Sequence, residues 1–184
     1  MGKDDPRTEA YGTLDEAVAA LGLARAELAA PSGATPDPLA EILLRLQRGL
    51  FVAGAELAAN PEAWDRLQDG VTRVDEAMVD EVETILAERE SSIEMPREFV
   101  VPGASRLSAA LEMARTVIRR AERRAVALDR EGLVAGPWLL AYLNRLADLV
   151  WVMARSAEQS EGVASIMARS GSRTARRTGG AGEG

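Results

Sequence analysis

The sequence predicts an all-α protein, an antiparallel bundle of five helices, and composition and periodicity both indicate this. Apolar residues make up 47% of the chain but aromatic residues only 4%, so the core must consist largely of Ala, Leu and Val. This composition favours helices over sheets, alanine most of all. Apolar residues recur at spacings of three and four through five segments, whereas strand-like alternation never lasts beyond four residues. The short connections between these segments favour antiparallel neighbours.

The first helix is expected over about residues 14–28. Thr13 and Glu16 fit a capping box, in which the threonine caps the helix and the glutamate reaches back. Asp15 then falls in the first turn, where the helix dipole favours a negative charge. Taken alone, Asp15 is explained by that position.

Four further helices are bounded by caps, prolines and glycines. Their expected ranges are 38–59 after an Asp37 cap, 73–90 after a Thr72 cap, 106–128 after a Ser105 cap, and 137–156 from Pro137. Residues 30–36 are expected to be a loop, residues 61–70 a linker with a helical turn, and residues 91–103 extended or loop. The bundle domain is placed at residues 1–158, followed by a Gly/Ser/Arg-rich tail over 159–184 that we expect to be disordered.

Composition excludes several classes of chemistry. The chain has no cysteine and no histidine, which removes thiolate sites, the serine triad and the commonest metal ligand. A net charge of −7 argues against a general nucleic-acid binder. We find no signal peptide and no apolar run long enough to span a membrane, so a cytoplasmic location and no membrane partner are expected.

An arginine-rich segment at residues 115–124 is the strongest functional signal. It holds five arginines and one glutamate. At about 100° per residue, Arg115, Arg119 and Glu122 lie together at the edge of the buried stripe of the fourth helix. Arginine offers five donors in a planar fork, which suits phosphates or carboxylates. A solvated basic face is the alternative interpretation of such a run.

Two other places carry unexplained residues. Asn144, Arg145 and Asp148 interrupt the broad apolar face of the fifth helix. Such residues are usually satisfied core polar groups or interface contacts, and ligand contact is the other possibility. Residues 99–103 place three apolar residues before Pro and Gly, either as a buried plug or as the wall of a pocket.

Together these motifs resemble the ATP:cob(I)alamin adenosyltransferases of the propanediol-utilisation type. The resemblance covers about residues 3–156. The segments that carry it are 3–7, 9–16, 46–51, 54–58, 99–103 (Phe-Val-Val-Pro-Gly), 115–124 and 142–148 (Tyr-Leu-Asn-Arg-Leu-Ala-Asp). It implies a five-helix bundle assembled as a homotrimer, with active sites between subunits. It also implies transfer of the 5′-deoxyadenosyl group of ATP to the cobalt of reduced cobalamin, with release of triphosphate.

The resemblance also assigns roles to residues. ATP and its Mg²⁺ would be contacted by Lys3, Arg119, Arg120, Glu122, Arg123 and Asn144. Arg119 and Arg123 would be catalytic, with Asp15 and Arg115 pairing across the subunit interface beside the site. Phe99 would line the corrinoid pocket and help to displace the lower axial ligand of cobalt. No direct protein ligand of the metal is assigned beyond a possible role for Glu122.

One family feature has no counterpart in the sequence. The family places a Gly/Thr-rich loop before its Lys-Asp-Asp segment, and that loop wraps the triphosphate through backbone N–H groups. Here the chain starts at the Lys-Asp-Asp segment. Two explanations stay open: a truncated start, or a divergent homologue with impaired ATP use that acts as a corrinoid-binding or scaffold subunit.

Overall fold

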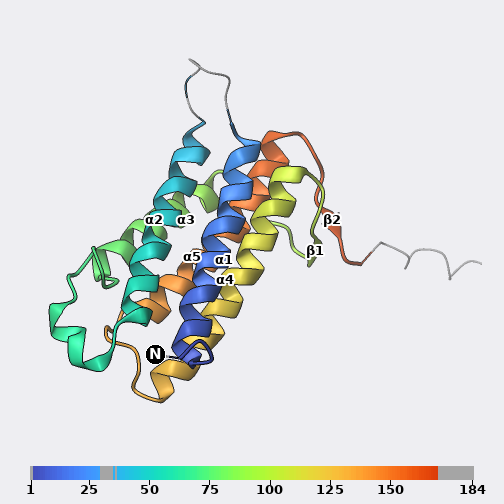
Figure 1. Cartoon of the computed structure of the whole chain (residues 1–184). Helices are drawn as coiled ribbons and strands as arrows, with labels where there is room; N and C mark the ends of the chain where they lie inside the picture. Colours follow the sequence, from blue (N-terminus) through green and yellow to red (C-terminus); the bar gives the residue numbers. More distant parts are fainter. Residues whose placement is uncertain (1, 30–34, 36, 170–184) are drawn as a thin grey trace, which may run out of the picture.

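A computed structural model describes residues 2–29, 35 and 37–169 of the chain. Within these residues five α-helices form the bundle (Figure 1). One 3₁₀ helix and a two-stranded sheet lie in the segments outside these helices. The elements are α1 (Pro6–Glu27), α2 (Pro38–Ala58), η1 (Pro61–Arg66), α3 (Glu76–Ser91), β1 (Val100–Val101), α4 (Arg106–Arg130), α5 (Leu139–Ser160) and β2 (Ile166–Met167). The predicted all-α five-helix bundle is confirmed. The expected loop at residues 30–36 and the tail at residues 170–184 lie outside the described residues, apart from Thr35.

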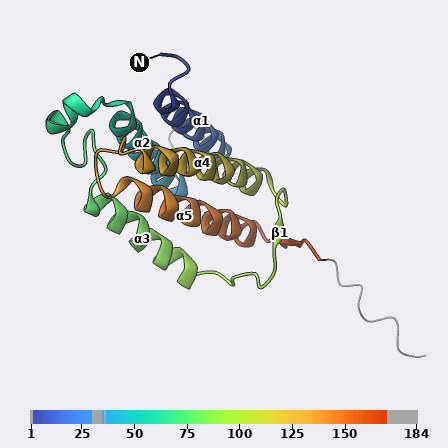
Figure 2. The same cartoon turned by 90° about the horizontal axis from the view of Figure 1, so that it is seen from below.

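The helices pack in a defined order. Helix α1 packs against α2 and α4, α4 packs against α5, and α5 packs against α3. Figure 2 shows α3 beyond α5, on the side away from α1. Helix α4 therefore lies between α1 and α5, and α5 lies between α4 and α3.

The starts of α1 and α3 differ from the prediction. Helix α1 begins at Pro6, because Asp5 caps it by accepting from the Arg7 N–H at 2.9 Å. Thr13 is therefore a residue of the helix interior, where its hydroxyl donates to the Glu9 carbonyl at 2.6 Å. Asp15 likewise lies well inside α1, so the first-turn explanation for it was wrong. Helix α3 starts at Glu76 after an Asp75 cap and not after Thr72, whose hydroxyl accepts from the Gln68 N–H.

The core is built from alanine, leucine and valine, as the composition predicts. One close side-chain contact lies between α2 and α5. Tyr142 is buried, and a Cβ atom added to Gly49 would overlap its hydroxyl oxygen. Glycine at position 49 therefore leaves room for the Tyr142 side chain, which reaches α2 from α5.

A buried carboxylate closes one end of the bundle. Glu56 on α2 is 1% exposed and accepts from the N–H groups of Val74 and Gly136, each at 2.8 Å. It thus holds the segment before α3 and the segment before α5 against α2. Burial raises the pKa of the Glu56 carboxyl above its ordinary value, although both backbone hydrogen bonds lower it.

The chain after residue 156 is more structured than expected. Helix α5 continues to Ser160, and Ile166 and Met167 pair antiparallel with Val101 and Val100. The described structure therefore extends past the expected domain boundary at residue 158. None of the helices in the described part of the chain is both long and apolar enough to cross a bilayer.

Candidate active site

A three-residue polar cluster joins α4 to α5. The Glu122 carboxylate accepts from the Asn144 amide at 2.9 Å and pairs with the Arg119 guanidinium at 3.2 Å. The Glu122 side chain is 15% exposed and that of Arg119 is 44% exposed. Of the residues predicted to contact ATP, these three come together directly. Glu122 holds Asn144 and Arg119 in place, and the arginine still faces solvent.

The other arginines of residues 115–124 diverge around α4. Arg123 donates to the Arg119 carbonyl at 3.0 Å, so it stays beside the cluster. Arg120 and Arg124 turn toward α1, where they pair with Glu16 and Glu9. The segment is therefore not a uniform basic face. It has one side that braces α1 and another that borders open space.

Two clefts meet at Arg115 and Trp151. The first, here called the Phe99 cleft, has a volume of about 580 Å³ and is lined by Phe99, Val100, Glu112, Arg115 and Trp151, among others. The second, the Arg119 cleft, has a volume of about 540 Å³ and is bordered by Arg115, Arg119, Arg145, Asp148 and Trp151, among others. One cleft is therefore largely apolar, the other largely charged, and Arg115 contributes to both.

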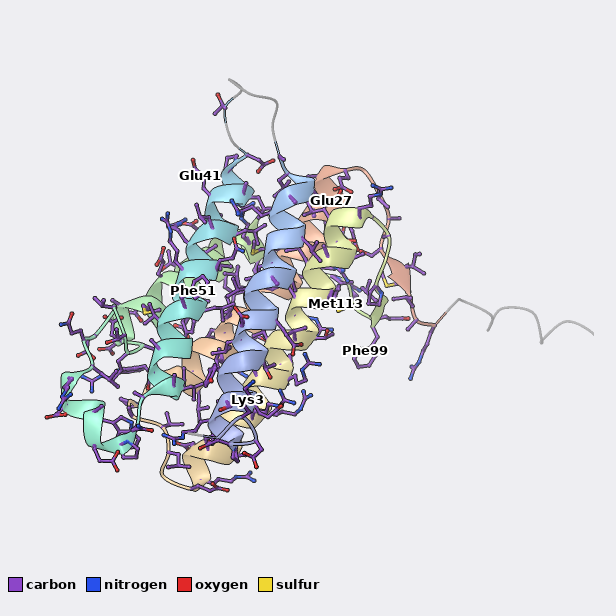
Figure 3. The ribbon with its side chains drawn as sticks, in the orientation of Figure 1. Lys3, Glu27, Glu41, Phe51, Phe99 and Met113 are labelled. Atoms are coloured by element: carbon purple, nitrogen blue, oxygen red, sulfur yellow. The ribbon has the colours of Figure 1, made fainter. Side chains whose placement is uncertain are left out.

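Phe99 is not a buried plug. Its side chain is 87% exposed, and Figure 3 shows it projecting beside α4 on the same side as Met113. Strand β1 directly follows Phe99, and the N–H of Ala168 donates to the Phe99 carbonyl at 2.7 Å. The pocket-wall alternative for residues 99–103 therefore describes the structure.

Arg115 belongs to a charged network that the sequence did not reveal. Its Nε donates to Glu112 at 2.7 Å, and Glu112 also pairs with Arg155 at 3.2 Å. Glu112, Arg155 and Glu158 are 3%, 0% and 0% exposed. The available signal was the pair Arg155 and Glu158, three residues apart on the apolar helix α5. Their partner on α4 depends on how the two helices align, which the sequence pattern does not give.

Asp15 and Lys3 lie away from these clefts within one chain. Asp15 borders a groove of about 470 Å³ between α1 and α2, together with Tyr11, Val18 and Phe51, among others. Phe51 is 61% exposed there. Among the described residues Asp15 forms no ion pair with Arg115, whose carboxylate partner is Glu112. Lys3 is exposed on the segment before α1 (Figure 3).

Among the described residues, the acidic groups do not form a metal cage. In the described ranges no three Asp or Glu side chains gather closely enough to hold a metal ion. Glu122 is the carboxylate placed between Arg119 and Asn144, so it could supply one oxygen ligand to a cation carried in by a phosphate ligand. This fits Mg²⁺, which is usually bound through one or two carboxylates plus substrate phosphates.

The arrangement pairs a phosphate-type site with an aromatic wall. Arginines fixed by carboxylates favour an oligophosphate, and an open cleft with Phe99 and Trp151 favours a large flat apolar ligand. The cobalamin adenosyltransferase family model matches residues 1–157 of the chain. The chain belongs to the cobalamin adenosyltransferase family. The predicted resemblance is therefore confirmed.

Two members of this family are similar to the chain along most of their own length. The corrinoid adenosyltransferase of Citrobacter freundii is 36% identical over 163 residues, covering 89% of this chain and 87% of the relative. That of Bacillus subtilis is 35% identical and is covered over 80% of its length. A variant of the PduO-type ATP:corrinoid adenosyltransferase of Lactobacillus reuteri, solved with cobalamin and ATP, superposes with a TM-score of 0.78. It is 29% identical, and the match covers 92% of this chain and 90% of that one.

Proposed function

We propose that this member of the family transfers the 5′-deoxyadenosyl group of ATP to the cobalt of reduced cobalamin. The observation that carries the proposal is the junction of the two clefts at Arg115 and Trp151. A nucleotide held by Arg119 and a corrinoid held beside Phe99 would meet there. Relatives that share the name corrinoid adenosyltransferase, and one solved with both cobalamin and ATP, support it.

The reaction requires little from the protein by way of proton transfer. The reduced cobalt supplies the electron pair, the cobalt–C5′ bond forms, and the bond from C5′ to the triphosphate oxygen breaks. No general base is needed, which agrees with a chain that has no histidine. The work left to the protein is alignment of the reacting atoms and stabilisation of charge on the departing triphosphate.

The cluster of Arg119, Glu122 and Asn144 suits the triphosphate. Arg119 and Arg123 are placed to stabilise its growing charge, and Lys3 and Arg120 would add positive charge from the α1 side. Asn144 is oriented by Glu122, so its carbonyl oxygen stays available to the nucleotide. Glu122 would also provide the protein ligand for Mg²⁺, which when bound offsets phosphate charge.

Phe99 would form the apolar wall of the corrinoid site. A side chain that is 87% exposed in the free chain would become buried against the face of a corrin ring. Such burial favours removal of the lower axial ligand from cobalt, because the wall offers no polar replacement. A four-coordinate Co(II) is easier to reduce, so the wall helps to form the nucleophile.

A homotrimer would complete the site. Asp15 and the exposed Phe51 lie in the groove between α1 and α2, whereas Arg115 lies between the two clefts near α5. A pair between Asp15 and Arg115 would therefore join two copies of the chain. The apolar lining of the α1 and α2 groove supports a protein contact at this surface. A cytoplasmic location stays an expectation from the sequence.

A direct assay tests the proposal. The protein is mixed with ATP, Mg²⁺ and chemically reduced cobalamin, and adenosylcobalamin formation is followed by absorbance. Product is expected from the wild-type chain, with a much slower rate from Arg119→Ala. Calorimetry of ATP and of cobalamin binding accompanies the assay. A folded protein that binds cobalamin but neither binds ATP nor forms product would contradict the proposal and indicate a corrinoid-binding subunit.

A further inference from the structure

We propose that Arg155 is a positioning residue that sets both walls of the Phe99 cleft. The inference rests on the proposed function, because it assigns a role in holding the corrinoid. Arg155 does not line the cleft. It is buried in the core, where it links the helix that carries Arg115 to the short sheet whose first strand follows Phe99.

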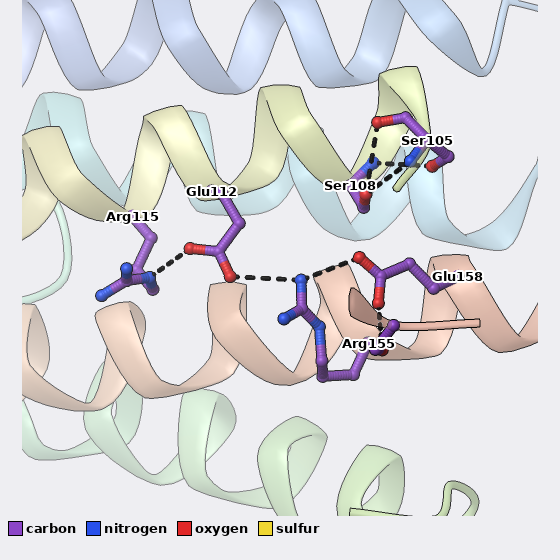
Figure 4. Close-up of polar contacts among 7 residues, drawn as sticks. Ser105, Ser108, Glu112, Arg115, Arg155 and Glu158 are labelled. Carbon is purple, nitrogen blue, oxygen red and sulfur yellow. Dashed lines mark hydrogen bonds and ion pairs between the residues drawn. The ribbon is translucent and has the colours of Figure 1, made fainter. Parts of the chain in front are cut away.

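The contacts of Arg155 are unusual for a stabilising ion pair. Its Nη2 atom alone serves two carboxylates, Glu112 at 3.2 Å and Glu158 at 3.0 Å (Figure 4). Its Nε and Nη1 atoms are buried and have no hydrogen-bond partner among the described residues. The guanidinium carbon also lies 5.7 Å from the centre of the Trp151 ring, which borders the Phe99 cleft.

The first arm of this network leads to Arg115. Glu112 uses one carboxylate oxygen for Arg155 and the other for Arg115, at 2.7 Å. The Arg115 side chain is 30% exposed, so it would otherwise be free to move among rotamers. Because Arg155 fixes the Glu112 carboxylate from the core side, the Arg115 guanidinium is directed into the space between the clefts.

The second arm leads to Phe99. Glu158 accepts from the Arg155 guanidinium with one oxygen and from the Ser165 hydroxyl with the other. Ser165 directly precedes β2, which pairs with β1, and the Ala168 N–H donates to the Phe99 carbonyl. Arg155 therefore anchors the strand that in turn fixes the backbone of Phe99.

Stability alone does not account for an arginine at this position. Buried ion pairs can often be replaced by apolar side chains without loss of stability, and unpaired buried donors are unfavourable. Two of the three guanidinium nitrogens have no partner within the described ranges. What an apolar side chain could not do is orient two carboxylates that point toward opposite walls of one cleft. In the part of the chain that the structure describes, the cluster of Arg119, Glu122 and Asn144 shares no polar contact with Arg155. The link of Arg155 to the Arg119 cleft is Arg115, which Glu112 still holds, so nucleotide binding should depend on Arg155 much less than cobalamin binding does.

The double variant Arg155→Met with Glu158→Gln tests Arg155 together with its partner Glu158. Methionine keeps the apolar bulk, and glutamine keeps a partner for Ser165 without leaving an unpaired buried charge. Glu112 keeps Arg115 as its partner. Arg45→Met is the matched control, because Arg45 pairs at 2.7 Å with Glu81 on the surface and lies outside both clefts.

Three measurements are made on each protein. Thermal unfolding reports folding, hydrogen exchange of the unliganded protein reports the Ala168 and Val101 amides, and calorimetry reports ATP and cobalamin binding. The double variant is expected to stay folded, to exchange the Ala168 amide about tenfold faster, and to bind cobalamin about tenfold more weakly. Its ATP affinity should stay within about twofold of wild type. Arg45→Met should match wild type in all three.

The outcomes separate the inference from the function on which it rests. Unchanged cobalamin affinity in a folded double variant, or equal loss of ATP and cobalamin affinity, would overturn the role of Arg155. If the double variant does not fold, Arg155→Lys carries the test. Lysine keeps the buried positive charge but ends one bond short of Nη2, the atom that contacts both carboxylates. It should selectively weaken cobalamin binding, and equal loss of both ligands overturns the inference. If wild type binds neither ligand, the proposed function fails. The anchoring role is then judged by hydrogen exchange alone, and an Ala168 amide that exchanges equally fast in the double variant and in wild type overturns it.

Discussion

On the side of α4 that faces α1, Arg120 and Arg124 end on acidic residues of the neighbouring helix, Glu16 and Glu9. On the side that faces the clefts, Arg115 and Arg119 pair with carboxylates of α4 itself, three residues away. Because their partners lie on α1, Arg120 and Arg124 hold α4 against α1. Partners on the same helix hold the second pair in place and leave the adjoining space open. The helix that supplies the carboxylate thus separates the arginines that hold α4 against α1 from those that border the clefts.

Arg119→Ala should have the largest effect on activity. Removal of one preorganised donor to developing charge typically costs about 10²–10³-fold in rate. The side chain is 44% exposed, so the free energy of unfolding should change by less than about 1 kcal/mol. The rate of adenosylcobalamin formation and a urea unfolding curve check the two parts. A stability loss that equals the activity loss would remove the distinction between the two sides of α4.

The pair of Asp15 and Arg115 should show the next largest effect, on assembly. If they meet between subunits, each single change to alanine strands a partly buried charge, at a cost of up to about 3–5 kcal/mol. The double change should then cost less than the sum of the singles. Sedimentation of the four proteins measures this, with Arg130→Ala, at the exposed end of α4, as control. Simple additivity, or a monomeric wild type, would show that the two residues do not pair.

Glu56 differs from the carboxylates that pair with the α4 arginines, because backbone N–H groups hold it. Glu56→Gln should lower the free energy of unfolding by about 1–3 kcal/mol, since one buried N–H loses its acceptor. The pKa of Glu56 is raised in the folded state, so the folded chain binds its proton more tightly than the unfolded chain. Between the unfolded and folded pKa values, stability therefore falls as pH rises.

Glu56→Gln should lack that component of the pH dependence. The advantage of wild type over the variant should accordingly be largest at acid pH and shrink as pH rises through the folded pKa. Urea unfolding of both proteins across this range measures the difference. A difference that is constant with pH would mean that burial does not disfavour the charged form of Glu56.

Arg124→Ala should have the smallest effect. Its guanidinium pairs with the Glu9 carboxylate at 2.8 Å and donates to the Glu9 carbonyl at 3.0 Å, and its side chain is 36% exposed. Loss of these contacts should cost about 1 kcal/mol of stability, with activity within about twofold of wild type. Thermal unfolding and the adenosylcobalamin assay check this. A large activity loss at unchanged stability would group Arg124 with Arg115 and Arg119.

Much of the fold could be predicted because the helices depend on local patterns. Ser105 caps α4 through the hydroxyl and backbone contacts that its position suggests, and it shares a capping box with Ser108. The start of α1 was missed although Asp5 and Pro6 repeat the cap pattern used correctly at Asp37 and Pro38. The match of Thr13 and Glu16 to a capping box is misleading, because the Thr13 hydroxyl bonds to the Glu9 carbonyl inside the helix.

The site was less accessible to sequence reasoning than the fold. Helical spacing brings Arg119 and Glu122 together, and both contribute to the observed cluster. Spacing does not show that Arg120 turns to Glu16, nor that Glu112 meets Arg155, since both contacts depend on the alignment of two helices. The two-residue sheet was missed because Val100 and Val101 are too few to display alternation. Their partners lie about 65 residues further along the chain, where the sequence predicts no order.

The close approach of Gly49 to Tyr142 limits how this protein can vary over evolution. Any side chain at position 49 would overlap the tyrosine hydroxyl, so the two positions cannot enlarge independently. A library that randomises position 49 alone should return glycine almost exclusively. A library that randomises both positions should return alanine or serine at 49 together with a smaller residue at 142. The two positions are therefore expected to covary in size among homologues.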